Sequence, residues 1–166
     1  MVEKIVGRAK WLIKQYETRD PFRIAGELGI HVEYKDLGKL KGMYTVIKRN
    51  RFAVINNNLD EYIQRLVCAH EIGHDQFHRA LALDGWLHEF MLYNMKTRPE
   101  YEANIFAAEL LLPDDEILEL IDIGYDYEQI ASVMYSDINL VGIKMGSLIR
   151  QGYNLRQLEY CDNFFK

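Results

Sequence analysis

The run His70-Glu71-Ile72-Gly73-His74 constrains this chain more than any other feature, because it lies inside a stretch with helical periodicity. From Asn58 to about Arg79 the sequence has no proline, and apolar residues recur at helical spacing. The segment Asn58-Leu59-Asp60-Glu61 matches a capping box at the start of that helix. The pattern therefore predicts that both histidines and the glutamate lie on one long helix.

This spacing is typical of a metal site. Residues four apart on a helix differ by about 40° of rotation and one turn of rise, so His70 and His74 point toward a common position. Two imidazole nitrogens there can bind one Zn²⁺ at about 2.0–2.1 Å. Glu71 lies about 100° around the helix from His70, so its carboxylate lies beside the ion and can take a proton from the attacking water. The motif predicts a zinc site with Glu71 as the catalytic base.

A catalytic zinc ion takes three protein ligands and keeps one open position. His78 is eight residues from His70, about 80° around the helix, so a straight helix does not bring all three rings comfortably to one ion. His88 could reach from an irregular segment. The third option is a carboxylate from the following helix, which offers Glu100, Glu102 and Glu109. Helical spacing alone leaves the choice among these residues open.

A second motif narrows this choice. The segment from Glu102 to Pro113, Glu-Ala-Asn-Ile-Phe-Ala-Ala-Glu-Leu-Leu-Leu-Pro, resembles the second signature of the ImmA/IrrE metallopeptidase family, E-A-N-x-F-A-x-x-L-L-x-P. That family pairs this signature with an upstream H-E-x-x-H, and the likeness covers roughly residues 20–115. The resemblance implies zinc bound by His70, His74 and Glu102.

The resemblance also implies a function. Members of this family cleave helix-turn-helix repressors. The resemblance therefore implies that this chain is a zinc endopeptidase and that its protein substrate is such a repressor. The chain departs from the family pattern at Asp75, where a small or apolar residue is more usual. We expect the Asp75 carboxylate to face solvent rather than to bond a ligand imidazole. The residue that stabilises the oxyanion stays open among His78, His88 and Tyr101.

The remaining pattern predicts an α+β fold with a small antiparallel sheet packed on helices and a zincin-like active-site helix. We expect one metallopeptidase-like domain over residues 1–166, with a catalytic core at 20–115 and a helical C-terminal part at 116–166. Expected helices are 2–18, 21–28 and 100–112, followed by short helices separated at Gly124-Tyr125 and around 136–139. Expected strands are 30–34, 42–47 and 52–55, with a possible further strand at 90–93.

Composition limits the partners. The formal net charge of −5 argues against non-specific nucleic-acid binding, which depends on many Lys and Arg contacts to phosphates. No window has the roughly 18 apolar residues of a membrane span. The sequence has only two cysteines, Cys68 and Cys161, too few for the disulfide framework of a secreted protein. We therefore expect a cytoplasmic protein, and from the lack of a long apolar window we expect no membrane partner.

Two alternatives remain. Residues 127–149 can be interpreted as a helix-turn-helix that binds DNA, although the second half has few basic residues. The chain could also be a zinc-bearing protein that sequesters a regulator without cleaving it.

Overall fold

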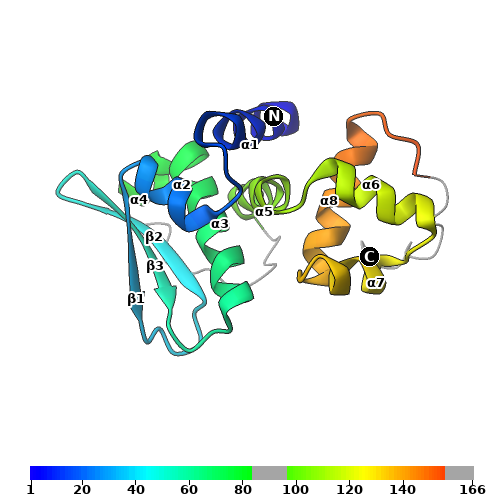
Figure 1. The fold of residues 1–166 in the computed structure, drawn as a ribbon. Helices are drawn as coiled ribbons and strands as arrows, with labels where there is room; N and C mark the ends of the chain where they lie inside the picture. Colours follow the sequence, from blue (N-terminus) through cyan, green and yellow to red (C-terminus); the bar gives the residue numbers. More distant parts are fainter. Residues whose placement is uncertain (84–96, 156–166) are drawn as a thin grey trace. The chain divides into compact units, whose positions relative to one another are not determined.

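The computed structural model describes residues 1–83 and 97–155, which fall into two compact units, Met1–Leu111 and Leu112–Lys166. Figure 1 labels the helices and strands. The first unit contains α1 (Val2–Tyr16), α2 (Pro21–Glu27), β1 (Ile30–Lys35), β2 (Gly42–Ile47), β3 (Asn50–Asn56), α3 (Glu61–Phe77), α4 (Arg79–Leu83) and α5 (Arg98–Leu111). The second contains α6 (Asp114–Ile123), α7 (Tyr127–Val133) and α8 (Ile138–Arg150). The α+β class and the three predicted strands are confirmed.

The sheet has the order β1-β3-β2. β2 and β3 form the predicted antiparallel hairpin, in which Tyr44 is opposite Ala53. β1, in contrast, pairs in parallel with β3, with Val32 also opposite Ala53, so the expectation of an antiparallel sheet is wrong for this pair. Burial accounts for the strand order: the last four residues of β3 are all buried, which suits the central strand, and β1 then takes the edge that β2 leaves open.

Local signals in the sequence account for several helix ends. The Asp20 side chain accepts a hydrogen bond from the Phe22 amide at 3.1 Å, and Pro21 is the first residue of α2. Gly29 has φ +70°, a left-handed conformation that suits glycine after a helix end. The start of α3 differs from the prediction: the helix begins at Glu61 after Asp60, which makes no side-chain capping bond, so the capping box from Asn58 is wrong.

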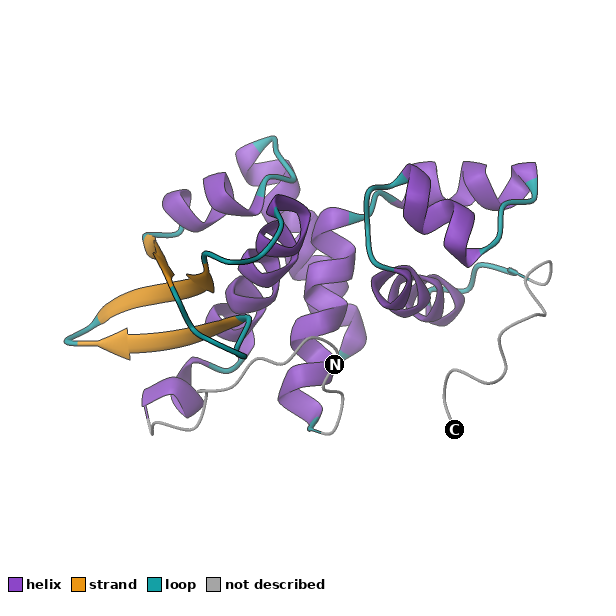
Figure 2. Ribbon diagram, turned by 90° about the horizontal axis from the view of Figure 1, so that it is seen from below, coloured by secondary structure: helices purple, strands orange, loops and turns teal. Residues whose placement is uncertain are grey.

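Helix α3 packs against α5 on one side and against strands β2 and β3 on the other (Figure 2). The α3–α5 contact is close at Gly73, where an added Cβ would lie 3.0 Å from the Ala103 Cα and 3.2 Å from its carbonyl oxygen. Glycine is therefore needed at this position for the two backbones to approach each other. This crossing fixes which residues of α5 can reach the histidines of α3.

The described residues of the second unit, 112–155, contain the helices α6, α7 and α8. Gly124 follows α6 with φ +94°, and Asp126 and Gln129 form a reciprocal capping box at the start of α7. Inside this unit the fully buried Lys144 of α8 forms an ion pair with Asp114 at the start of α6. α7 and α8 are thus packing helices of a small bundle.

Three sequence predictions lie outside the described residues: the strand at 90–93, His88 and Cys161. Among residues 1–83 and 97–155, no helix combines the length and apolar character needed to cross a membrane.

Candidate metal centre

The histidines of α3 lie together in the interior. His70 is fully buried and His74 is 3% exposed. Their Nε2 atoms are 2.9 Å apart, one helical turn after another on the face that α5 covers. The two imidazoles therefore approach each other in the structure, as their spacing on the helix predicts.

Glu100, in the first turn of α5, completes this cluster. Its Oε2 lies 3.2 Å from His70 Nε2 and its Oε1 lies 3.3 Å from His74 Nε2. One ligand atom from each of the three residues can be chosen so that all lie within 4.8 Å of one another. Because Ala103 contacts Gly73, the residue one turn earlier on α5 lies over the two histidines, and that residue is Glu100.

Glu102 lies elsewhere. It is two residues from Glu100 and so about 200° around the helix. Its Oε2 is 3.0 Å from His78 Nε2, and its Oε1 accepts a hydrogen bond from Arg98 Nε at 2.7 Å. The structure therefore brings Glu100, and not the expected Glu102, to both histidines. Glu109 is buried farther along α5 and is not part of the cluster.

The donor set suits a divalent cation. His70 Nδ1 is 2.9 Å from Asn104 Oδ1, so we assign the proton to Nδ1, where it is donated to the amide oxygen. The lone pair of Nε2 then faces the Nε2 of His74 and the Glu100 carboxylate. Burial raises the pKa of Glu100, but the imidazoles of His70 and His74 next to its carboxylate outweigh this and lower the pKa to about 2. Two imidazoles and one ionised carboxylate are the His₂Glu ligand set of catalytic zinc sites.

Glu71 lies beside this cluster, on a different side of α3. It is 1% exposed, and its Oε1 has no hydrogen-bond partner among the described residues. Burial, and then the charge of Glu100, raise the pKa of Glu71 well above its ordinary value. A carboxylate with a raised pKa is a better proton acceptor at neutral pH, which is the property a general base needs.

The first residue of β2 closes over Glu71. A Cβ at Gly42 would lie 2.9 Å from Glu71 Oε1 and would overlap the Val67 side chain. Only glycine fits there without displacing one of them. The start of β2 thus lies directly against the carboxylate, a contact that sequence reasoning missed.

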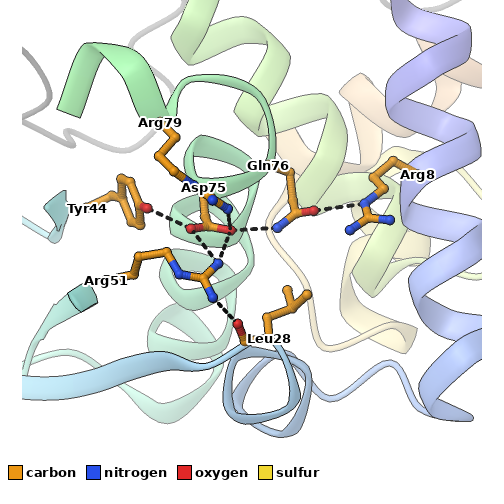
Figure 3. A network of polar contacts seen from close by, with 7 residues as sticks. All are labelled: Arg8, Leu28, Tyr44, Arg51, Asp75, Gln76 and Arg79. Atoms are coloured by element: carbon orange, nitrogen blue, oxygen red, sulfur yellow. Dashed lines mark hydrogen bonds and ion pairs between the residues drawn. The ribbon is translucent and has the colours of Figure 1, made fainter. Parts of the chain in front are cut away.

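Asp75, the residue after the second histidine, is the centre of a buried network (Figure 3). The expectation that it faces solvent is wrong, because its side chain has no exposed surface. Its carboxylate accepts hydrogen bonds from four side chains: Tyr44 at 2.6 Å, Arg51 at 3.1 and 3.2 Å, Gln76 at 2.6 Å and Arg79 at 2.9 Å. Burial first, and then the hydrogen bond to Asp75, raise the pKa of Tyr44.

This network ties the metal-binding end of α3 to the rest of its unit. Arg51 also donates to the carbonyl of Leu28 after α2, and Gln76 accepts from Arg8 of α1 at 2.8 Å. The Asp75 network therefore links β2, β3, α1, α2 and α4 to the turn of α3 that carries His74 (Figure 3). Arg79 lies one helical turn after Asp75, at a spacing that sequence can indicate, whereas Tyr44 and Arg51 are more than 20 residues away and spacing gave no signal for them.

Of the oxyanion candidates, Tyr101 is half-buried on α5, His88 lies outside the described residues, and His78 is 8% exposed with its ring against His74. The position of His78, one turn after His74, is the one signal in the sequence that could have indicated this contact.

Comparison with known proteins gives a consistent result. The profile of a peptidase family described as the IrrE N-terminal-like domain matches residues 25–135. The chain is 41% identical over 104 residues to "Uncharacterized immunity region protein 2" of Bacillus phage phi105, a match that covers 62% of this chain and 65% of the phage protein. It is 30% identical over 127 residues to "Metallopeptidase ImmA" of Bacillus subtilis (strain 168), covering 73% of this chain and 72% of that protein.

Proposed function

The chain belongs to the ImmA/IrrE metallopeptidase family, and from this membership we propose that it is a zinc-dependent endopeptidase. The single observation that carries the proposal is the convergence of His70, His74 and Glu100 beside the buried carboxyl of Glu71. A family resemblance alone would leave open whether this chain keeps a complete site.

We assign the metal ligands to His70 Nε2, His74 Nε2 and one carboxylate oxygen of Glu100. Glu102, which the resemblance favoured, is replaced by Glu100 in this assignment because its carboxylate bonds His78 and Arg98 instead. Zinc is the ion whose preferences the ligand set matches best, with nitrogen and carboxylate donors and one position left for substrate or water.

A zinc ion held there would act as a Lewis acid, polarising the scissile carbonyl and making the attacking water more acidic. Glu71 would take the proton of that water on its carboxylate and then deliver it to the leaving amide nitrogen. The burial of Glu71 supports both steps, because it raises the pKa of the carboxyl and so brings it closer to the pKa of the attacking water. Gly42 excludes any side chain from the space in front of Oε1.

For the substrate we propose a protein, and specifically a helix-turn-helix repressor whose cleavage relieves repression. The names of the two relatives support this, one a metallopeptidase and the other a phage immunity region protein. Direct DNA binding is not part of the proposal, because the chain has a net charge of −5 and α7–α8 form part of a helical bundle. We propose that the enzyme acts in the cytoplasm, where such repressors are found.

The test is incubation with a purified helix-turn-helix repressor from the same genome, with and without a chelator, followed by mass analysis. We expect two fragments, absent with chelator and absent with Glu71→Gln. The opposite result is an intact repressor held in a stoichiometric complex by both the wild type and Glu71→Gln. That result would contradict the endopeptidase function and would favour a zinc-bearing protein that sequesters its partner without cleaving it.

A further inference from the structure

A row of four side chains leads away from the metal cluster at His74. His74 Nδ1 lies 3.2 Å from His78 Nδ1, and His78 Nε2 lies 3.0 Å from Glu102 Oε2. Arg98 Nε then donates to Glu102 Oε1 at 2.7 Å. His74, His78 and Glu102 are all buried, at 3%, 8% and 7% exposure. The row joins the last turn of α3 to the first turn of α5.

The chemistry of the far end sets the direction of every hydrogen bond in the row. Arg98 can only donate, so Glu102 accepts from it as a carboxylate. The other oxygen of Glu102 also accepts, and the His78 Nε2 proton is therefore donated to it. In neutral His78 the lone pair is then on Nδ1, which must accept. The donor is the Nδ1 proton of His74, so the lone pair of His74 is on Nε2.

This lone pair faces His70 Nε2 at 2.9 Å and Glu100 Oε1 at 3.3 Å. His70 has the same tautomer, with its proton on Nδ1 and its lone pair on Nε2. In this case Asn104 Oδ1 accepts the Nδ1 proton directly, without a second imidazole between them. Both rings thus present Nε2 lone pairs to the same position. His78 faces His74 with its Nδ1 and so uses the edge of the His74 ring that is remote from the metal position.

We infer that His78 and Glu102 are positioning residues for His74, fixing its ring orientation and its tautomer so that Nε2 is free to bind the metal. The inference rests on the proposed function. A metal-bound histidine commonly donates its second ring N–H to a carboxylate or carbonyl. Here the carboxylate of Glu102 bonds His78, and His78 in turn bonds His74. Glu102 is therefore not itself a ligand of the metal.

The test is the affinity for Zn²⁺, measured by competition with a chromophoric chelator on the full chain. His78→Phe keeps a ring of similar size but cannot accept the Nδ1 proton of His74, so we expect affinity to fall about 10- to 100-fold. Glu102→Gln keeps an oxygen that accepts from His78 Nε2, so we expect a smaller loss. Glu100→Gln removes a ligand and should lose more than about 100-fold. His31→Phe, an exposed histidine of β1 away from the site, is the matched control and should bind as the wild type does.

A second readout separates positioning from folding. We expect the visible absorption spectrum of Co²⁺-saturated His78→Phe to differ from that of the Co²⁺-saturated wild type, because the His74 ring is no longer held. A role in folding alone would lower the thermal stability and leave this spectrum unchanged, which would overturn the inference. Glu102→Gln, the more conservative change, gives the same comparison if His78→Phe does not fold.

Two results contradict the inference in different ways. If Glu102→Gln loses as much affinity as Glu100→Gln, then Glu102 is a ligand and not a positioning residue. If His78→Phe binds Zn²⁺ as tightly as the wild type, the row of hydrogen bonds does not act on His74. A wild-type protein that binds no metal at all would instead overturn the proposed function itself.

Discussion

Two glutamates of this site have pKa values that move in opposite directions. Glu71 has a raised pKa because it is buried and close to the charge of Glu100. The pKa of Glu100 is lowered to about 2, because the effect of the neighbouring imidazoles of His70 and His74 outweighs the effect of burial. Two carboxyl groups with opposite pKa shifts in one site are typical of a division of roles, which supports the roles we propose, proton acceptor for Glu71 and metal ligand for Glu100.

We predict that Glu71→Gln abolishes peptide cleavage while the protein still binds one equivalent of metal. The amide cannot accept the proton of the attacking water, and general-base catalysis typically contributes about 100- to 10,000-fold. Cleavage is followed by mass analysis and metal by elemental analysis of the same sample. Cleavage by the variant at the wild-type rate would remove Glu71 from the mechanism.

The same substitution should stabilise the metal-free protein at neutral pH. In the unfolded chain the Glu71 carboxyl ionises near its ordinary pKa of about 4.3, whereas in the folded protein this pKa is raised. Ionisation therefore favours the unfolded chain as the pH rises above that value. We expect Glu71→Gln to be more stable at pH 7 by about 1–3 kcal/mol, because the amide stays neutral, whereas the buried carboxyl must either carry a charge or stay protonated above its ordinary pKa.

Below about pH 4 the advantage of Glu71→Gln should disappear, because the carboxyl is then protonated in both the folded and the unfolded chain. Urea unfolding of chelator-treated protein at pH 4 and pH 7 measures the difference. An equal free energy of unfolding for the two proteins at pH 7 would show that the buried charge has no cost.

At the scale of elements, the α3–α5 crossing is the contact on which the site depends. Gly73→Ala would place a methyl group 3.0 Å from the backbone of Ala103 and force the helices apart. We predict a loss of about 1–3 kcal/mol in the free energy of unfolding, and weaker metal binding because Glu100 moves away from α3. Gly7→Ala in α1 is the control, since its methyl group meets nothing within 4 Å and should be neutral or stabilising.

The Asp75 network is the second link between elements. Asp75→Asn would leave Arg51 and Arg79 without their counter-charge; solvent screens these partly exposed arginines, and we predict a loss of about 2 kcal/mol in the free energy of unfolding. Tyr44→Phe removes a single hydrogen bond and should cost about 1 kcal/mol. Thermal or urea unfolding of both variants tests this order. A smaller effect of Asp75→Asn than of Tyr44→Phe would show that the two arginines contribute nothing.

The elements were largely predictable from sequence, because periodicity and capping residues such as Asp20 are local signals. The pairing of β1 was not, since the alternation of its side chains is the same for a parallel and an antiparallel neighbour. His70, Glu71 and His74 were predictable because one helix carries all three. Glu100 could not be separated from Glu102 by spacing alone, because the choice depends on how α5 crosses α3 at Gly73.

For the whole molecule, metal binding and folding should be linked. The three ligands that we propose come from two helices that meet only in the folded chain, so an ion that binds there stabilises the folded state. At a zinc concentration about 100 times the dissociation constant, the gain is about 2.7 kcal/mol. We predict that a chelator lowers the melting temperature of the wild type and does not change that of Glu100→Gln. Identical shifts in the two proteins would place the metal elsewhere.

The proposed function requires that His70, His74 and Glu100 together hold one divalent metal ion. The most direct measurement is a crystal structure of the zinc-loaded protein with diffraction data collected on both sides of the zinc absorption edge. We expect one anomalous peak, bounded by the Nε2 atoms of both histidines and a carboxylate oxygen of Glu100, with Glu102 still bonded to His78. A crystal without a peak at this position, or with Glu102 bound to the ion in place of Glu100, would contradict this expectation.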